Sequence, residues 1–416
     1  MKLFYHSAVK TAIVIQNISV MNRTIINKIK TNKTLYSLYY YIGSNCVKFL
    51  GLFTSINKKR IIFSSFGGRK YDDSPKCIYE TMRKDSRFEG FEFVWCFNNP
   101  SKHHVNGCKI IRCDTFGYYK MLMSSGVWVT NSTMERGLSF KPKSIFNINT
   151  WHGSAIKLIG SDVPSGSKSF ISKGSENHDD IMLAQSMFDV EVFSKAFGIP
   201  KEKFRTVGLP RNDELTNCNT EEYRRSIRKQ LGITEGKKVI LYAPTYREYD
   251  RDPYSNCILM PPINLKKLEE KLGTDYVILM RAHYEVVKTM KIDENNFIKN
   301  VSSHPNLNEL MIVSDILVSD YSSIFFDYSI QDKPMLCFAY DYDKYASVRG
   351  MYFDIREKLG GNSENEDELI SAIKNLNEEK AIKITQAFRQ EFVEAYGSAS
   401  KLTVDIIWKY LNGETY

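Results

Sequence analysis

From residue 60 onward the chain alternates short apolar runs with longer stretches of helical composition, and this alternation limits the folds open to it. The intervening segments, such as 75–85 and 115–125, are long enough for crossover helices. Near-continuous apolar strands separated by helices predict parallel sheets covered on both faces. The apolar runs are 60–66, 91–97, 109–113, 126–131, 144–152 and 181–186, then 204–208, 237–246, 276–283, 296–301, 315–320 and 334–340.

The runs form two series, and 416 residues exceed the usual size of one hydrophobic core. We therefore expect an α/β fold with two Rossmann-like domains facing a cleft and a helical C-terminus. The predicted boundaries are 1–57 for a basic helical extension, 58–203 for an N-terminal domain and 204–416 for a C-terminal domain. Neither GxGxxG nor GxxxxGK[ST] occurs, so a dinucleotide fold and a P-loop are unsupported.

The positive charge is confined to the start of the chain. Met1 to Tyr71 contains twelve Lys and Arg and no acid, so it carries +12, and the remainder carries −3 because the whole chain carries +9. This uneven distribution argues against a general nucleic-acid binder.

The aromatic stretch 35–53 lies within this basic segment. It is interrupted by Ser37, Ser44, Asn45 and Lys48, so it lacks the run of about 20 apolar residues that a spanning helix needs. Nothing near the start resembles a secretory cleavage site. We expect interfacial helices resting on an anionic membrane, at its cytoplasmic face. A helical extension packed on the protein, with solvated charges, is the alternative.

Eight cysteines show no CxxC pair, which is typical of reduced thiols in a cytoplasmic protein. No Cys/His group has zinc-ligand spacing, and Asp320 and Asp327 are too far apart in sequence for an acidic metal cluster. We expect no metal and no cofactor. A Gly/Ser-rich stretch, 160–180, predicts a mobile loop beside the first strand-end motif described below, or else an ordinary surface excursion.

Ligands of open parallel sheets bind at the carboxyl ends of strands, and the first polar strand end is "TWHG". His152 is a possible base there, Gly153 permits close backbone approach, and Lys157 adds a charge if a helix follows. A satisfied structural histidine is the alternative for His152.

Three strand ends of the second series carry groups suited to phosphate. "VGLPRND" presents Arg211 to clamp a phosphate, or else to pair with Asp213 on the surface. "LYAPTYR" ends its strand at Pro244 and leaves the Thr245 hydroxyl for a ligand, or else for a helix N-cap.

"LMRAHY" places Arg281 and His283 on one side of an extended segment, as an anion site or a solvated edge pair.

The last strand end, "VSDYSSIFFDYS", opens a helix at Ser322 and Ser323, whose hydroxyls and free amides suit an anion. Asp327 shares their side of that helix and suits the hydroxyls of a sugar or polyol. The alternative is an ordinary N-cap at Asp320 or Ser322. Together the strand ends indicate a transferase that uses a nucleotide-activated donor, with His152 as base on the other domain.

The motifs "NTWHGSAIKLIG", "VGLPRND", "ILYAPTYRE", "LMRAHY" and "VSDYSSIFFDYS" resemble, in order and spacing, those of the CDP-glycerol glycerophosphotransferases, over about residues 58–400. The resemblance implies a GT-B fold and transfer of glycerol phosphate, or in relatives ribitol phosphate, from a CDP-alditol to a polyprenyl-diphosphate-linked saccharide acceptor in teichoic acid or capsule synthesis. His152 would take a proton from an acceptor hydroxyl. The oxygen of that hydroxyl would then attack the β-phosphorus of the donor while CMP leaves.

The resemblance also implies the site residues. His152 is the base, and Ser154 and Ala155 replace the Thr and Pro of the usual "TWHGTPLK", a departure that bears on the identity of the alditol and the acceptor. Ala282 replaces the usual Met or Leu. The implied donor contacts are His152, Gly153, Ser154, Ala155, Ile156, Arg211, Pro244, Thr245, Arg281, Ala282, His283, Ser322, Ser323 and Asp327.

Two other functions are compatible with the same strand ends. One is a GT-B glycosyltransferase that uses a UDP- or GDP-sugar, and the other is a membrane-bound scaffold with an inactive transferase fold. The sequence leaves open whether one unit or a polymer is added, and the oligomeric state.

Overall fold

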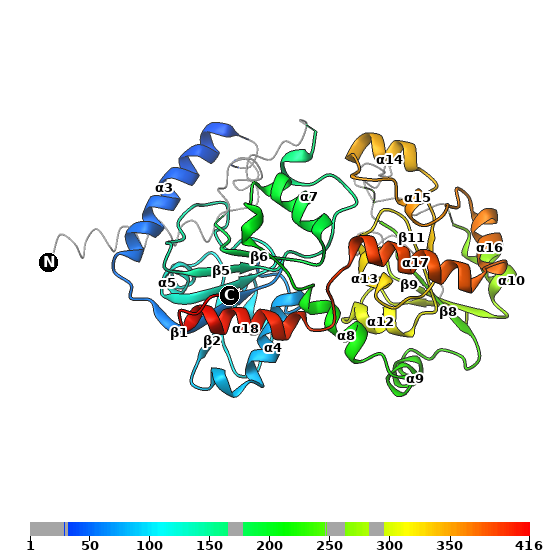
Figure 1. Ribbon diagram of the computed structural model, residues 1–416, viewed down its shortest axis with the longest axis horizontal. Coiled ribbons are helices and arrows are strands. Elements are labelled where there is room, and N and C mark those ends of the chain that lie inside the picture. Colours follow the sequence, from blue (N-terminus) through cyan, green and yellow to red (C-terminus); the bar gives the residue numbers. More distant parts are fainter. Residues whose placement is uncertain (1–28, 30–31, 165–177, 246, 248–262, 283–294) are drawn as a thin grey trace. The chain divides into compact units, whose positions relative to one another are not determined.

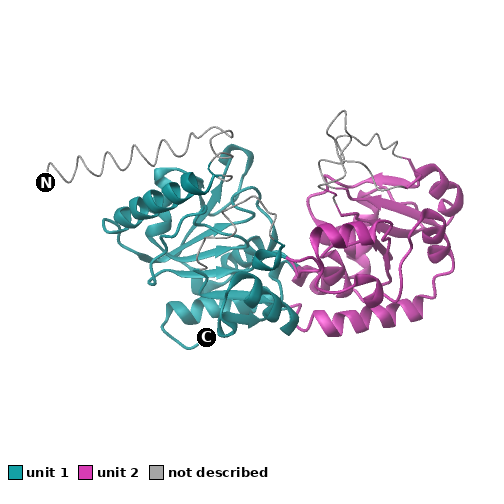
Figure 2. Cartoon of the chain, turned by 90° about the horizontal axis from the view of Figure 1, so that it is seen from above, with its two compact units in different colours: residues 1–152, 159–211, 398–416 teal, residues 153–158, 212–397 magenta. Residues whose placement is uncertain are grey.

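The computed structural model describes residues 29, 32–164, 178–245, 247, 263–282 and 295–416, which form two compact units (Figure 1). Unit 1 comprises residues 1–152, 159–211 and 398–416, and unit 2 comprises residues 153–158 and 212–397 (Figure 2).

Unit 1 contains a seven-stranded sheet in the order β3-β2-β1-β4-β5-β6-β7, with every neighbouring pair parallel. Side chains alternate between its faces: Ile61 and Phe63 of β1 enter one hydrophobic cluster, and Ile62 enters the other. The strands are β1 (Asn57–Ser64), β2 (Glu92–Phe97), β3 (Lys109–Arg112), β4 (Ser125–Thr130), β5 (Phe146–Asn149), β6 (Ile181–Ala184) and β7 (Phe204–Thr206).

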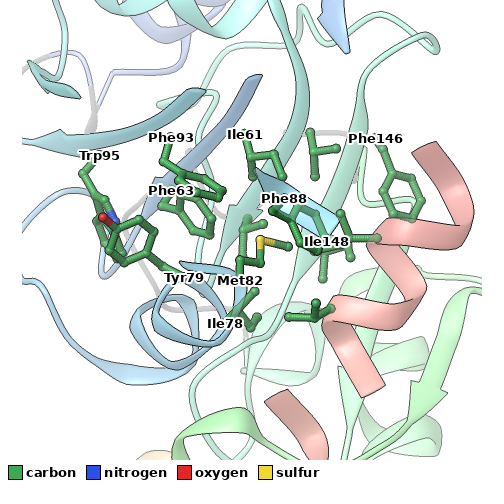
Figure 3. Close-up of a cluster of buried hydrophobic side chains, with 14 of the residues drawn as sticks. Ile61, Phe63, Ile78, Tyr79, Met82, Phe88, Phe93, Trp95, Phe146 and Ile148 are labelled. Atoms are coloured by element: carbon green, nitrogen blue, oxygen red, sulfur yellow. The ribbon is translucent and has the colours of Figure 1, made fainter. Parts of the chain in front are cut away.

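Helices cover both faces of this sheet. On one face, α4 and α18 pack against a cluster that includes Phe63, Trp95 and Phe146 (Figure 3). On the other face, α5 and α3 pack around Trp128. Each fully buried Ile, Leu or Phe contributes about 1.5–3 kcal/mol, so burial on both faces holds the sheet together. The helices are α3 (Lys33–Gly51), α4 (Asp73–Arg83), α5 (Phe116–Met123), α7 (Met187–Phe197) and α18 (Ala399–Leu411).

Unit 2 contains a five-stranded parallel sheet in the order β10-β9-β8-β11-β12. The strands are β8 (Lys238–Tyr242), β9 (Tyr276–Met280), β10 (Ile298–Asn300), β11 (Ile316–Ser319) and β12 (Met335–Cys337). The helices are α8 (Asp213–Asn217), α9 (Glu221–Gln230), α10 (Leu265–Leu272), α12 (Leu307–Val313), α13 (Ile324–Ser329), α14 (Tyr342–Arg349), α15 (Ile355–Lys358), α16 (Glu366–Lys374) and α17 (Glu378–Phe392).

The predicted α/β class with two Rossmann-like units is confirmed, and each of the twelve apolar runs overlaps a strand. The division between the units differs from the predicted boundary at 203/204. β7 pairs with β6 at the edge of the first sheet, so the chain enters unit 2 after Arg211. The C-terminal helix α18 returns to unit 1 because Val404 and Ile407 complete the cluster over α4.

Helix α3 packs on the rest of unit 1 through Val47, which belongs to the hydrophobic cluster around Trp128, and through polar contacts. Its Tyr36 and Tyr39 hydroxyls donate to backbone carbonyls of the 136–137 turn, and Ser44 Oγ accepts from the amide of Ser139. Gly43 permits this approach, because a Cβ there would lie 2.8 Å from a methyl group of Leu138. The predicted basic extension before this helix lies largely outside the described residues.

Candidate active site

The order of the unit 1 strands places the candidate base next to a topological switch point. The strand order reverses between β1 and β4, and ligands of open α/β sheets bind outside the carboxyl ends at that point. β4 ends just before Asn131, and its neighbour β5 leads into Trp151 and His152. The chain after β1 supplies Phe66, whose ring centroid lies 5.9 Å from that of His152.

His152 is held by Asn131. Its Nδ1 lies 2.8 Å from the Asn131 carbonyl oxygen, which can only accept, so Nδ1 carries the hydrogen and donates it. Nε2 then bears the lone pair of the neutral ring. His152 remains an exposed residue. This tautomer suits a general base, because the nitrogen not used by the protein is the one able to take a proton.

The pKa of His152 lies below its ordinary value, chiefly because the surrounding protein removes water from the imidazole. The bond to Asn131 and the charge of Asp73 raise it, whereas Arg211 and Arg69 lower it. The net lowering keeps the ring neutral near pH 7.

The loop after β1 is tied to the same asparagine. The Phe66 amide donates to Asn131 Oδ1 at 2.7 Å, and the Gly67 amide donates to Ser132 Oγ at 3.0 Å. Gly68 has a φ of 81°, and a Cβ there would lie 2.6 Å from Cys113 Sγ, so only glycine fits without strain.

Arg211 lies behind the backbone of His152. Its Nη1 donates to Asp73 Oδ2 at 2.9 Å and to the His152 carbonyl at 2.7 Å. The structure thus brings two predicted site residues, His152 and Arg211, together in unit 1. The role of Arg211 as a phosphate contact stays a prediction.

Unit 2 has the same kind of switch point, between β8 and β11. Thr245 follows β8 and Pro244, and its amide donates to Oδ1 of Asp320, the residue after β11, at 2.8 Å. The Thr245 hydroxyl oxygen is buried and has no hydrogen-bond partner among the residues described. Such a group is costly unless a ligand or water satisfies it, which supports the prediction of a ligand contact at Thr245.

A buried arginine supports this loop from beneath. Arg247 is 2% exposed, donates to the Thr245 carbonyl at 2.6 Å, and pairs with Asp320 and Asp341, each at 2.8 Å. Three tyrosine rings, those of Tyr321, Tyr340 and Tyr345, surround its guanidinium at 4.8–5.1 Å. The cluster fixes the backbone that presents Thr245.

The strand end after β9 is tied to the chain after β10. Arg281 Nη1 donates to the carbonyls of Val301 and His304, and the Ala282 amide donates to Ser302 Oγ. These bonds fix the side chain of Arg281 and the backbone of Ala282, both predicted donor contacts. His283 lies outside the described residues.

Helix α13 begins where the sequence predicts. Ser323 is its N-cap residue without a side-chain capping bond, and Ser322 Oγ accepts from the Ile324 amide at 3.3 Å. Asp327 lies on the inner side of the helix, 4% exposed, and its Oδ1 accepts from Asn212 Nδ2 at 2.7 Å. This carboxylate anchors the turn that enters unit 2, and its predicted contact with polyol hydroxyls remains untested.

The segment after the candidate base belongs to unit 2 and is extended. Gly153 has a φ of 141°, and Lys157 forms an isolated antiparallel bridge with Met351. No helix therefore follows Gly153, although a helix there was the condition for Lys157 to add its charge to the site. The predicted donor contacts Ser154, Ala155 and Ile156 are buried, so any contact through their side chains requires close approach to this backbone.

Sequence reasoning missed Asp73, Asn131 and the Arg247 cluster. Asn131 ends one of the predicted strands, so the rule applied to the other strand ends would have selected it. Asp73 belongs to the first pair of acidic residues in the chain, after a long basic segment. From the sequence alone, this position indicates only how charge is distributed along the chain. Within the described part of the chain, no group of three or more His, Cys, Asp and Glu is arranged to hold a metal ion.

Comparison with known proteins agrees with the motifs. The family described as CDP-Glycerol:Poly(glycerophosphate) glycerophosphotransferase matches residues 46–409. A teichoic acid poly(glycerol phosphate) polymerase of Staphylococcus epidermidis is 34% identical over 377 residues, 85% of this chain and 51% of that protein, so the chain spans about half its length.

Two other similarities cover nearly the whole of the known protein. A teichoic acid glycerol-phosphate transferase of Staphylococcus aureus is 31% identical over 372 residues, 85% of this chain and 94% of that protein. The solved structure of the wall teichoic acid polymerase TagF matches with a TM-score of 0.79 and 31% identity, over 92% of this chain and 97% of that one. The chain therefore belongs to the CDP-glycerol:poly(glycerophosphate) glycerophosphotransferase family.

Proposed function

We propose that the chain transfers glycerol phosphate from CDP-glycerol to a lipid-linked acceptor or a growing poly(alditol phosphate) chain in teichoic acid or capsule synthesis, and releases CMP. The observation that carries this proposal is the hydrogen bond from His152 Nδ1 to the Asn131 carbonyl oxygen, which leaves Nε2 as the nitrogen able to act as a base. The family description names CDP-glycerol, and a TagF variant was solved after a CDP-glycerol soak.

In the proposed reaction, His152 Nε2 takes the proton from a terminal hydroxyl of the acceptor. The resulting oxygen attacks the β-phosphorus of the donor in line, a new P–O bond forms, and the bond to the bridging oxygen breaks so that CMP leaves with the electron pair. Phosphoryl transfer depends mainly on positioning and on electrostatic stabilisation. Unit 1 supplies the base, and Thr245, Arg281 and the start of α13 in unit 2 are the proposed donor contacts.

We further propose that α3 holds the enzyme against the cytoplasmic face of the membrane. Its outward side exposes Leu38, Tyr41 and Ile42, at 56%, 71% and 44%, although its inward side is bonded to unit 1. Lys48 and the nearby Lys58 and Lys59 add positive charge. Exposed apolar side chains beside lysines suit an anionic lipid surface. Among the described helices, none combines the length and apolar character needed to cross a bilayer.

Incubating the protein and a lipid-linked acceptor with CDP-glycerol and CDP-ribitol in parallel tests the proposal. Mass spectrometry of the products is expected to show added glycerol phosphate, with CMP as the released nucleotide. His152→Ala should abolish transfer, by at least about 100-fold, while calorimetry still detects CDP-glycerol binding. Near-normal turnover of His152→Ala, or product only from CDP-ribitol or from a UDP- or GDP-sugar, would contradict the proposal. Product length distinguishes addition of one unit from polymerisation.

A further inference from the structure

A buried ion pair of unit 1 supports the backbone of the candidate base. The Asp73 and Arg211 side chains are 6% and 15% exposed, with Nη1 of Arg211 at 2.9 Å from Asp73 Oδ2. The same Nη1 donates to the carbonyl of His152 at 2.7 Å. The three residues come from the start of α4, the turn after β7 and the chain after β5. Through these contacts, the Arg211 side chain links the start of α4 to the chain after β5.

The backbone at this point is strained. Trp151 and Asp73 have φ values of 50° and 63°, a region that residues with a side chain rarely adopt. Such conformations persist only where the surrounding structure over-determines them, and they concentrate at functional sites.

Asp73 is fixed accordingly. Its amide donates to the Asp72 carboxylate at 2.8 Å, and its Oδ1 accepts from the Ser74 amide at 2.7 Å. Ser74 Oγ in turn accepts from the backbone amide of Arg211 at 3.3 Å.

We propose that Asp73 is a positioning residue of the transfer reaction, which holds Arg211 against the carbonyl of His152 and so fixes the direction of the imidazole. This inference rests on the proposed function, because it takes His152 as the base. Asn131 fixes the ring through Nδ1, and Arg211 fixes the peptide from which the ring projects. With both ends held, Nε2 keeps one direction.

The charges around His152 give this role a distinct signature. Asp73 on α4 raises the pKa of His152, whereas Arg211 and Arg69, on the turn after β7 and the loop after β1, lower it. From the residue after β4, the neutral carbonyl of Asn131 faces the ring. Removing the charge of Asp73 should therefore lower the pKa of the base, and removing the charge of Arg211 should raise it. Because a nearby charge alone can shift this pKa, as Arg69 does, a fall in kcat with little change in KM is the readout that identifies the positioning role.

The test measures kcat, KM for CDP-glycerol and the pH profile of kcat/KM. In Asp73→Asn, one oxygen remains for the Ser74 amide, while an NH2 group replaces the oxygen that faces Arg211. We expect kcat to fall about 10- to 100-fold, KM to change little, and the acid limb to move to lower pH. Arg211→Met should move the acid limb to higher pH. The matched control, Asp72→Asn, keeps an acceptor for the Asp73 amide and should retain wild-type kcat and pH profile.

Wild-type kcat and an unmoved acid limb in Asp73→Asn, with His152→Ala inactive, would overturn this inference and leave the proposed function standing. Turnover by His152→Ala would instead overturn the proposed function. Tryptophan fluorescence checks the folding of the variants, since all four tryptophans lie in unit 1. If Asp73→Asn does not fold at the assay temperature, Arg211→Met decides alone, and an unmoved acid limb in that variant overturns the inference.

Discussion

Replacing Arg247 with Met should destabilise unit 2 by about 3–5 kcal/mol. The arginine is 2% exposed and pairs with Asp320 and Asp341, whose side chains are 2% and 14% exposed. Methionine fills much of the same space but leaves both carboxylates without their counter-charge. Breaking a buried pair by removing one partner carries this cost because the remaining charge stays out of water.

The aromatic contacts add to that figure. The guanidinium lies 4.9 Å from the ring centroid of Tyr321, 5.1 Å from that of Tyr340 and 4.8 Å from that of Tyr345. Each desolvated cation–π contact contributes roughly 0.5–2 kcal/mol. Met recovers part of this through sulfur–aromatic contact, at about 0.3–1.5 kcal/mol. The ion pairs alone account for about 3–5 kcal/mol, so the lost aromatic contacts make that range a lower bound.

Hydrogen exchange is the suitable assay, because tryptophan fluorescence reports only on unit 1. Peptides covering β8 and β11 should lose protection by about 150- to 4,000-fold, which corresponds to the expected loss of stability. Tryptophan fluorescence should be unchanged and serves as an internal control. CDP-glycerol binding should weaken as well, because Arg247 holds the carbonyl of Thr245.

Arg225→Met is the matched control. Its ion pair with Glu221 spans 3.3 Å between side chains that are 76% and 68% exposed. An exposed helical pair of this kind contributes at most about 0.5 kcal/mol. If Arg247→Met cost less than about 1 kcal/mol, or no more than the control, the assignment of this cluster as the support of Thr245 would be refuted.

Two further predictions concern the base and the membrane. Because the pKa of the proposed base His152 is lowered, log(kcat/KM) should be level near pH 7 and fall with unit slope at acid pH, with a midpoint below about 6.5, the ordinary pKa of histidine; a midpoint above that value would contradict the argument that the surrounding protein desolvates the imidazole. Replacing Leu38 and Ile42 together with Ser should reduce co-sedimentation with anionic vesicles and leave activity on a soluble acceptor intact, whereas Leu402→Ser, exposed to 43% on α18, should change neither; equal binding by the double variant and the wild type would exclude α3 as the contact.

The strands were predictable from the sequence because a parallel strand buried on both faces is a continuous apolar run. The run at 204–208 shows the limit of that signal: its pattern is correct for a strand, but only pairing with β6 decides which sheet it joins. The return of α18 to unit 1 cannot be predicted for the same reason, since nothing in the sequence around Val404 and Ile407 indicates that they pack against α4, more than three hundred residues earlier.

The site was predictable to a similar degree. His152 is visible as a polar residue at a strand end, but the hydrogen bond that selects its tautomer comes from the neighbouring strand end at Asn131. The support from Asp73 requires an ion pair across 138 positions of sequence, which no spacing rule can indicate.

The two switch points share one hydrogen-bonding arrangement but differ in the charge of the residue that accepts the bond. In unit 1, Asn131 follows β4 and accepts from the amide of Phe66 after β1. In unit 2, Asp320 follows β11 and accepts from the amide of Thr245 after β8. Asn131 is uncharged, so the residue that follows β4 places no fixed charge beside His152. The lowered pKa of His152 favours its neutral, basic form. The carboxylate of Asp320 instead requires a buried arginine, and the resulting pair makes a rigid loop with an unsatisfied hydroxyl. A base requires an uncharged ring, and a donor site requires a fixed loop, which is why we propose that unit 1 provides the base and unit 2 binds the donor.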